Sequence, residues 1–300
     1  MPGAARLATL EAEVSRERVP LRNAYLSPGQ RARVRVLGGG ECAVPVASPP
    51  PHPRLNHAAL VMARGDIKAN ETKTTREPET ATARVQLWVT EADAPDLWAA
   101  TPGETLLELG PFEGTGVDLK EVAGAFAFPT VVLFVSGEGV APARALLAAA
   151  PDAGGLVLNL RRDVVVYYKA PNARSLAFAD ELEAKWAQRA AAAGGYDASG
   201  LSAPKVRVVT ATRGETFAEM FDDDDELEYD PAQTAAIVFT GNRQRDDTDG
   251  LGASKKSEKQ EQAEADEADA LEAASAAEIA VVVRGDVDAE PVRHTETAKI

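Results

Sequence analysis

The stretch VLFVSGEGVAPARALL, from Val132 to Leu147, passes from an apolar strand through a glycine turn into a helix rich in Ala and Leu. Within it, Gly137, Gly139 and Pro142 give the spacing G-x-G-x-x-P. Glycines let a backbone approach a phosphate closely, and the N-terminus of the following helix offers free N–H groups. The same spacing also occurs in strand–turn–helix connections for structural reasons alone. Glu138, in the middle of the turn, adds a negative charge that opposes phosphate binding.

Strands alternate with helices after Pro129, a pattern that predicts a parallel sheet. The predicted strands are Thr130–Val135, Leu156–Asn159, Asp163–Tyr168, Lys205–Thr210, Ala235–Thr240 and Glu278–Gly285. The predicted helices are Ala141–Ala150, Leu176–Ala192 and Ala263–Ala277. The last of them either folds back to support the final strand or projects as a partner-binding arm, and helix propensity does not decide between these alternatives.

The first part of the chain shows short strands separated by turns, which favours an antiparallel barrel. The predicted strands are Arg31–Val36, Ala43–Ser48, His57–Ala63, Ala83–Val89 and Thr105–Phe112, with a short helix at Asp96–Ala100. The predicted fold therefore has two domains, an N-terminal antiparallel β-barrel and a C-terminal α/β domain with a parallel sheet. The predicted ranges are an N-terminal extension (1–19), the barrel (20–118), the α/β domain (119–285) with a polar insert (242–262), and a tail (286–300).

Charge and composition exclude several classes of function. The net charge of −15, from 47 acidic and 32 basic residues, argues against a nucleic-acid partner. No uninterrupted apolar run reaches the roughly 18 residues that span a bilayer. Cys42 is the one cysteine, which excludes an internal disulfide and a cysteine-based zinc site. No metal site is predicted, because His52, His57 and His294 are scattered and the run Asp222–Asp225 is typical of a solvated loop.

The order of these blocks resembles the ferredoxin–NADP reductase superfamily, in particular plant and algal ferredoxin-reductase-like oxidoreductases, over about residues 20–245. PGQRARVRV, from Pro28 to Val36, is similar to the strand that enters the flavin barrel of that family. PGETLLELGPFEGTGVDL, from Pro102 to Leu119, is similar to its closing strand. The glycine turn resembles the pyridine-nucleotide turn, and IVFTGN, from Ile237 to Asn242, takes the place of the Cys-Gly-Pro strand end.

The resemblance implies a site for NADP or NAD at the glycine turn. Its predicted residues are Ser136, Gly137, Glu138, Gly139, Val140, Ala141, Pro142 and Gly241. Glu138 replaces the small hydroxyl residue of the family turn, and Thr240 replaces the cysteine that faces the nicotinamide. The ribose-side motif keeps Tyr168 but loses its arginine, with Lys169 and Arg174 nearby.

The resemblance also implies an FAD-binding segment of the ferredoxin-reductase type. Its predicted residues are Val44, Pro45, Val46, Ala47 and Ser48. Here Cys42 stands where the family has the arginine that neutralises the flavin phosphate, and Val44 where it has the tyrosine that stacks on the flavin. The second flavin turn falls near Asp93 to Asp96, whose two acids would repel a pyrophosphate.

Two functions from different classes follow. The first is a flavoprotein oxidoreductase that transfers electrons between NAD(P)H and FAD, placed in the chloroplast by the resemblance and working with an electron-transfer protein. The second is a non-catalytic relative, a pseudoenzyme that has lost tight flavin binding and serves as a structural or regulatory subunit for a scaffold partner. No catalytic residue is assigned. Residues 1–20 contain Glu11, Glu13 and Glu17, so no transit peptide is visible.

Overall fold

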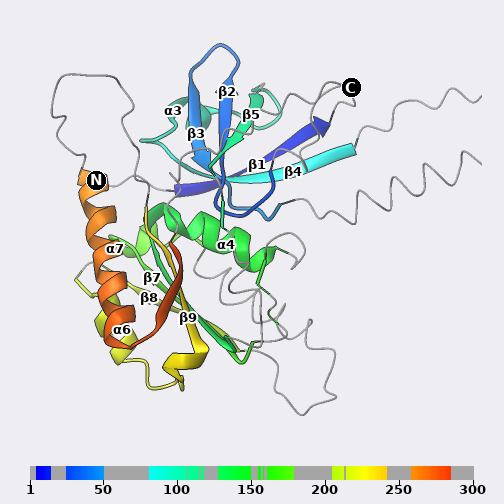
Figure 1. Cartoon of the computed structure of the whole chain (residues 1–300). Coiled ribbons are helices and arrows are strands. Elements are labelled where there is room, and N and C mark those ends of the chain that lie inside the picture. Colours follow the sequence, from blue (N-terminus) through cyan, green and yellow to red (C-terminus); the bar gives the residue numbers. More distant parts are fainter. Residues whose placement is uncertain are drawn as a thin grey trace, which may run out of the picture.

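The computed structural model describes residues 5–14, 25–50, 81–105, 107–114, 116–117, 128–149, 155–156, 158, 161–178, 205–212, 214–241 and 258–284. It confirms the predicted order of an antiparallel half followed by an α/β half with a parallel sheet. The antiparallel strands lie to one side of helix α4 and the parallel sheet lies to the other (Figure 1). The predicted boundary between residues 118 and 119 lies outside the described residues and stays a prediction.

The antiparallel half consists of two small sheets around one core. Its strands are β1 (Ala5–Val14), β2 (Arg31–Val36), β3 (Glu41–Pro45), β4 (Ala81–Thr90) and β5 (Leu107–Glu113), with the short helix α3 (Pro95–Ala99). The order β3–β2–β5 forms one sheet and β1–β4 the other, with a bridge between Val46 and Leu87. Strand β2 alternates in burial, so Ala32 and Val34 enter the core while its arginines face outward.

The α/β half has a five-stranded parallel sheet in the order β10–β9–β6–β7–β8. Its strands are β6 (Thr130–Ser136), β7 (Asp163–Lys169), β8 (Lys205–Ala211), β9 (Thr234–Phe239) and β10 (Ala280–Arg284). Every residue of β6 and β9 is buried, which explains their continuous apolar sequences. The chain adds β7 and β8 on one side of the central strand β6 and then β9 and β10 on its other side, so the order of the sheet reverses there.

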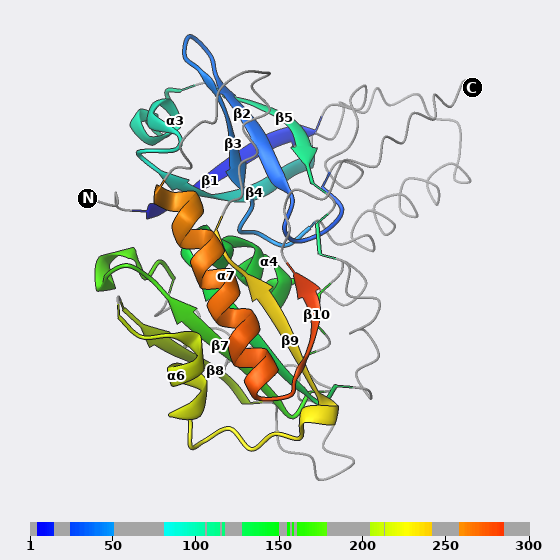
Figure 2. The same ribbon diagram turned by 60° about the vertical axis from the view of Figure 1, so that its left-hand side comes forward.

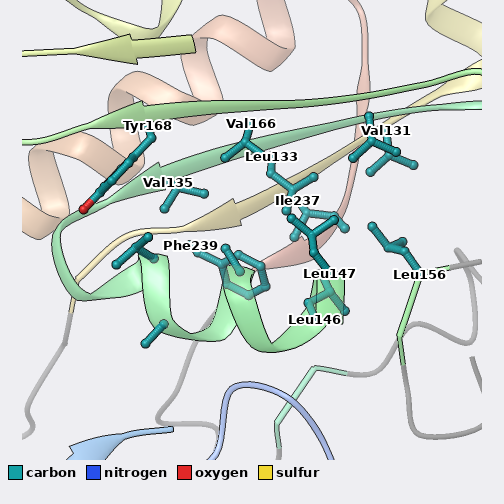
Figure 3. Close-up of a cluster of buried hydrophobic side chains, with 14 of the residues drawn as sticks. Val131, Leu133, Val135, Leu146, Leu147, Leu156, Val166, Tyr168, Ile237 and Phe239 are labelled. Carbon is teal, nitrogen blue, oxygen red and sulfur yellow. The ribbon is translucent and has the colours of Figure 1, made fainter. Parts of the chain in front are cut away.

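Helices cover both faces of this sheet. Helix α4 (Val140–Ala148) packs on one face, where Leu146 and Leu147 contact a cluster that includes Val131, Leu133 and Ile237 (Figure 3). Helices α6 (Phe217–Asp222) and α7 (Glu258–Ala276) pack on the other face (Figure 2). Three short 3-10 turns complete the described elements, η2 (Gly137–Gly139), η5 (Ala173–Ser175) and η6 (Pro231–Gln233).

Helix α7 corresponds to the last predicted helix, which the sequence allowed either to fold back on the sheet or to project as an arm. Its buried alanines, among them Ala270 and Ala274, pack against the face of the sheet that carries Phe134 and Val238. The helix therefore folds back onto the sheet and leads directly into β10. It begins at Glu258, inside the segment predicted as a polar insert.

Three local predictions differ from the structure. Residues 5–14, assigned to an extension, form β1, which pairs with β4 along its whole length. Leu156 and Leu158 lie outside any strand, although Leu156 is buried against the core of the α/β half. Leu176 to Phe178 form a turn instead of the start of a helix, and the rest of that predicted helix lies outside the described residues. The predicted strand at 57–63 also lies outside them.

One carboxylate of the run predicted as a solvated loop is buried. The side chain of Asp224 is only 4% exposed and accepts hydrogen bonds from Arg207 (2.9 and 2.7 Å) and from the Tyr167 hydroxyl (2.7 Å). Burial, the largest influence, would raise the pKa of Asp224, but the hydrogen bonds from Arg207 and Tyr167 lower this pKa overall. Asp222, Asp223 and Asp225 are exposed or nearly so, as predicted.

Asp224→Asn is expected to cost about 2–3 kcal/mol of unfolding free energy at pH 7, because it leaves Arg207 without its carboxylate. A carboxyl whose pKa is lower in the folded state stabilises the fold above its unfolded pKa of about 3.9, and this stability disappears as pH falls through the folded pKa. The difference between wild type and variant should therefore shrink below about pH 4 in urea unfolding at several pH values. Asp223→Asn, the exposed neighbour, is the control; an equal loss in both variants would contradict a special role for Asp224.

Candidate nucleotide site at the glycine turn

The glycine turn lies at the carboxyl end of β6, where the strand order of the sheet reverses. In open parallel sheets, ligands bind outside the carboxyl ends of the strands at such a reversal. Gly137 has a φ of +54°, in the left-handed region that favours glycine, and the space beside it is open. A Cβ on Gly139 would lie 2.6 Å from the carbonyl carbon of Phe239, and closer still to its oxygen. Gly139 is thus required by the packing of the turn on β9, and Gly137 is favoured by its left-handed backbone, whether or not a ligand binds.

Glu138 forms an ion pair with Arg31, a residue of the antiparallel half. Its carboxylate lies 3.3 Å from Nη1 of Arg31, at the start of β2, and both side chains are only 14% exposed. The same guanidinium donates from Nη2 to the Ala43 carbonyl oxygen at 2.7 Å. The negative charge of the turn is therefore neutralised by an arginine 107 residues away in the sequence. The pair joins the two halves beside the glycine turn.

Arg144 makes a second link between the halves. This residue of α4 is 8% exposed, and its Nη1 donates to the Ala47 carbonyl oxygen at 2.6 Å and to Oε1 of Gln86 at 2.8 Å. Its guanidinium also lies over the ring of Phe178, 5.3 Å from the ring centre. Because α4 belongs to the α/β half while Ala47 and Gln86 belong to the antiparallel half, Arg144 fixes one against the other.

Lys169 ends β7, directly beside Ser136 in the register of the sheet. Its Nζ lies 2.6 Å from Asp269 and 3.0 Å from Asp266, both on α7. Burial, the largest influence, lowers the pKa of Lys169, but the hydrogen bonds to Asp269 and Asp266 raise it overall, so the ammonium stays charged. Lys169, one of the two cations that the resemblance leaves on the ribose side, is therefore bonded to carboxylates of the same chain.

The predicted flavin segment turns its key side chains inward. Cys42 and Val44 pair with Val34 and Ala32 of β2, on the face that forms the core of the antiparallel half. Only a pairing register shifted by one residue would turn Cys42 and Val44 to the other face of the strand. Ala43 and Pro45 share the outward face with the arginines of β2. Cys42 and Val44, which take the places of the phosphate-binding arginine and the stacking tyrosine of the family, therefore do not reach that face.

The other predicted flavin residues are also buried. Val46 is in the core of the antiparallel half, and Ala47 is in the core shared with α4. The Ser48 hydroxyl accepts from the Gln86 amide at 3.0 Å, and its carbonyl oxygen accepts from the Tyr25 hydroxyl at 2.5 Å. Contacts from these side chains to a flavin are not supported by their positions, and the segment stays a prediction.

The predicted nucleotide residues do come together around the turn. Ser136, Gly139, Val140, Ala141 and Pro142 are buried there, while Gly137 and Glu138 are partly exposed. Gly241 follows β9, and a Cβ added to it would lie 3.9 Å from Cγ of Glu138. Sequence reasoning missed Arg31 and the carboxylates of α7; the outward alternation of RARVRV was the signal available for Arg31.

The described residues contain no group of three or more His, Cys, Asp or Glu side chains that could hold a metal ion. All three histidines lie outside them. The described helices include none with the length and hydropathy needed to cross a membrane. At the predicted second flavin turn, Asp96 lies in the first turn of the short helix α3, and its carboxylate accepts a hydrogen bond from the Gly40 amide at 2.6 Å.

No protein-family model and no curated protein sequence matches the chain. Among solved structures, it is similar to a ferredoxin NADP+ reductase from Neisseria gonorrhoeae with bound FAD and NADP, at 14% identity and a TM-score of 0.45, covering 79% of this chain and 82% of that one. It is similar to a cytochrome P450 reductase from Amycolatopsis, at 15% identity and a TM-score of 0.42, covering 79% of this chain and 60% of that one. A third is phthalate dioxygenase reductase, at 14% identity and a TM-score of 0.41, where the chain covers 57% of the other's length.

All three of these proteins are reductases. At such low identity the likeness concerns the path of the chain, so the fold assignment depends on the strand order and register described above. The chain spans less than two thirds of the length of two of the three. The plant and algal relation stays a prediction.

Proposed function

We propose that this chain is a ferredoxin-reductase-like protein that keeps the reductase architecture without holding flavin tightly, and that it serves as a structural or regulatory subunit for a protein partner. The observation that carries the proposal is the Arg31–Glu138 pair, which joins the two halves at the glycine turn. Because the Glu138 carboxylate and the Arg31 guanidinium neutralise each other, the pair offers no net positive charge to a phosphate at the turn.

Two further observations support the proposal. The side chains that stand for the flavin arginine and tyrosine lie on the core face of β3. Lys169 is bonded to two carboxylates of α7. Each is a place where the resemblance implies a cofactor contact and the chain makes an internal one.

The second candidate is an active oxidoreductase that transfers electrons between NAD(P)H and FAD. Arg31 favours it, because this arginine lies on the outward face of β2 beside the turn and would serve as a phosphate cation if Glu138 moved away. For either candidate the chloroplast is the proposed location, on the resemblance alone, and the partner is an electron-transfer or scaffold protein.

Glu138→Thr tests the turn. It removes the carboxylate, frees Arg31 and should raise the affinity for NADP+ by about tenfold, since one unpaired charge at an effective dielectric of about 20 contributes a few kcal/mol before solvent screening. Calorimetric titration measures this. Glu108→Thr is the matched control, because Glu108 pairs with Arg35 toward the other end of β2 from Arg31.

Wild-type titration with FAD separates the two candidates. The proposal predicts a dissociation constant weaker than about 100 μM, equivalent to roughly −5.5 kcal/mol. Micromolar FAD binding that Arg31→Met abolishes would support the active reductase instead. An NADP+ affinity equal in Glu138→Thr and Glu108→Thr would mean that the turn takes no nucleotide.

A further inference from the structure

Helix α7 packs along one face of the parallel sheet, and its N-terminal part lies near the carboxyl ends of the strands. Near its N-terminal end, Cβ of Ala263 is 3.7 Å from a Cβ built on Gly241, just after β9. Further along, Asp266 and Asp269 reach Lys169 at the end of β7. Figure 2 shows the helix running in front of β9 from the end nearest the antiparallel half. The helix thus passes over the ends of two strands that flank the glycine turn.

The contact with Lys169 is a built arrangement of several groups. Both carboxylates are largely buried, with side chains 9% and 16% exposed. Asp269 also accepts from the backbone amide of Phe217 at 3.0 and 3.1 Å, and the Lys169 ammonium lies 4.6 Å from the centre of the Phe217 ring. Gln262 donates to Asp266 at 2.9 Å. Each carboxylate is therefore held in place by a second partner.

A carboxylate pair around an ammonium has the charge and acceptor oxygens of a phosphate group. It is also placed where a doubly wound sheet receives its ligand. From this geometry we infer that α7 is an autoinhibitory element, whose Asp266 and Asp269 occupy Lys169 in competition with the phosphates of a nucleoside diphosphate. Displacement of α7 from its N-terminus as far as Asp269 exposes Lys169 beside Ser136 and the glycine turn. The inference concerns the nucleotide edge alone, so its outcome and that of the flavin proposal are independent.

Removing the two charges tests the competition. The double variant Asp266→Asn with Asp269→Asn keeps side-chain size and an acceptor oxygen for Phe217 but no longer neutralises Lys169. Allosteric and autoinhibitory couplings typically amount to about 5–150-fold. Calorimetry with ADP should therefore give at least about fivefold tighter binding than wild type. The control is Glu261→Gln with Glu272→Gln, the same charge change at exposed positions of the same helix.

Adding Lys169→Gln to the double variant should return ADP affinity to the wild-type level. Equal affinity in the double variant and the control, or a gain that persists without Lys169, would overturn the inference. Circular dichroism checks that each variant is folded. If the double variant is not, hydrogen exchange of the wild-type chain decides: amides of α7 should exchange faster with ADP at concentrations that saturate the chain, and unchanged exchange there would overturn the inference.

Discussion

Gly139→Ala is expected to destabilise the chain by roughly 3 kcal/mol or more, the largest effect of any single methyl group added to the turn. A Cβ at this position would overlap the carbonyl group of Phe239, which is backbone at the end of β9 and has no rotamer that moves it away. The turn and β9 would have to separate, opening the core where α4 packs on the sheet. Urea unfolding followed by circular dichroism measures the loss.

Gly137→Asn is the matched control for this prediction. Gly137 has a positive φ, which asparagine tolerates better than most residues, and nothing lies within 4 Å of the added Cβ. We expect a cost of about 1 kcal/mol or less. If Gly137→Asn were as damaging as Gly139→Ala, close packing against β9 would not be the reason for the second glycine.

Arg144→Met is expected to cost about 2–4 kcal/mol, because a buried guanidinium that bonds the Ala47 carbonyl and Gln86 is replaced by a side chain of similar length without donors. The substitution weakens the contact between the antiparallel half and the α/β half. The fluorescence of the three tryptophans, Trp88 in the shared core, Trp98 in α3 and Trp186, and circular dichroism should then give separate unfolding transitions.

Arg33→Met serves as the comparison. Its side chain is 48% exposed and pairs with Glu41 and Glu113 on the outer face of β2, so about 0–1 kcal/mol is expected. A loss in Arg144→Met no greater than in Arg33→Met would show that the halves are held together by apolar packing alone.

The parallel sheet could be predicted from the sequence because its strands are buried on both faces and read as continuous apolar runs. β6 and β9 are the clearest examples, and both were located to within a residue or two. β1 was missed because its sequence, ARLATLEAEV, mixes alanine and charged residues, and its partner β4 lies some 70 residues away. Pairing supplied by a distant strand leaves no local periodicity to detect.

The candidate site was less accessible to sequence reasoning. Its backbone could be predicted from the glycine spacing, but the partners of its charged residues could not. Arg31 reaches Glu138 across 107 residues, and Lys169 reaches Asp269 across 100. No spacing rule connects such pairs. The inward direction of Cys42 and Val44, in contrast, was available from the alternation of β3 against the core residues of β2.

The central claim is that the reductase architecture is kept while tight flavin binding is lost. It is tested most directly by the visible absorbance spectrum of the purified chain, before and after incubation with excess FAD and desalting. The account predicts a colourless protein in both cases. A flavin spectrum that survives desalting and is bleached by NADPH or NADH would contradict it and establish an active oxidoreductase.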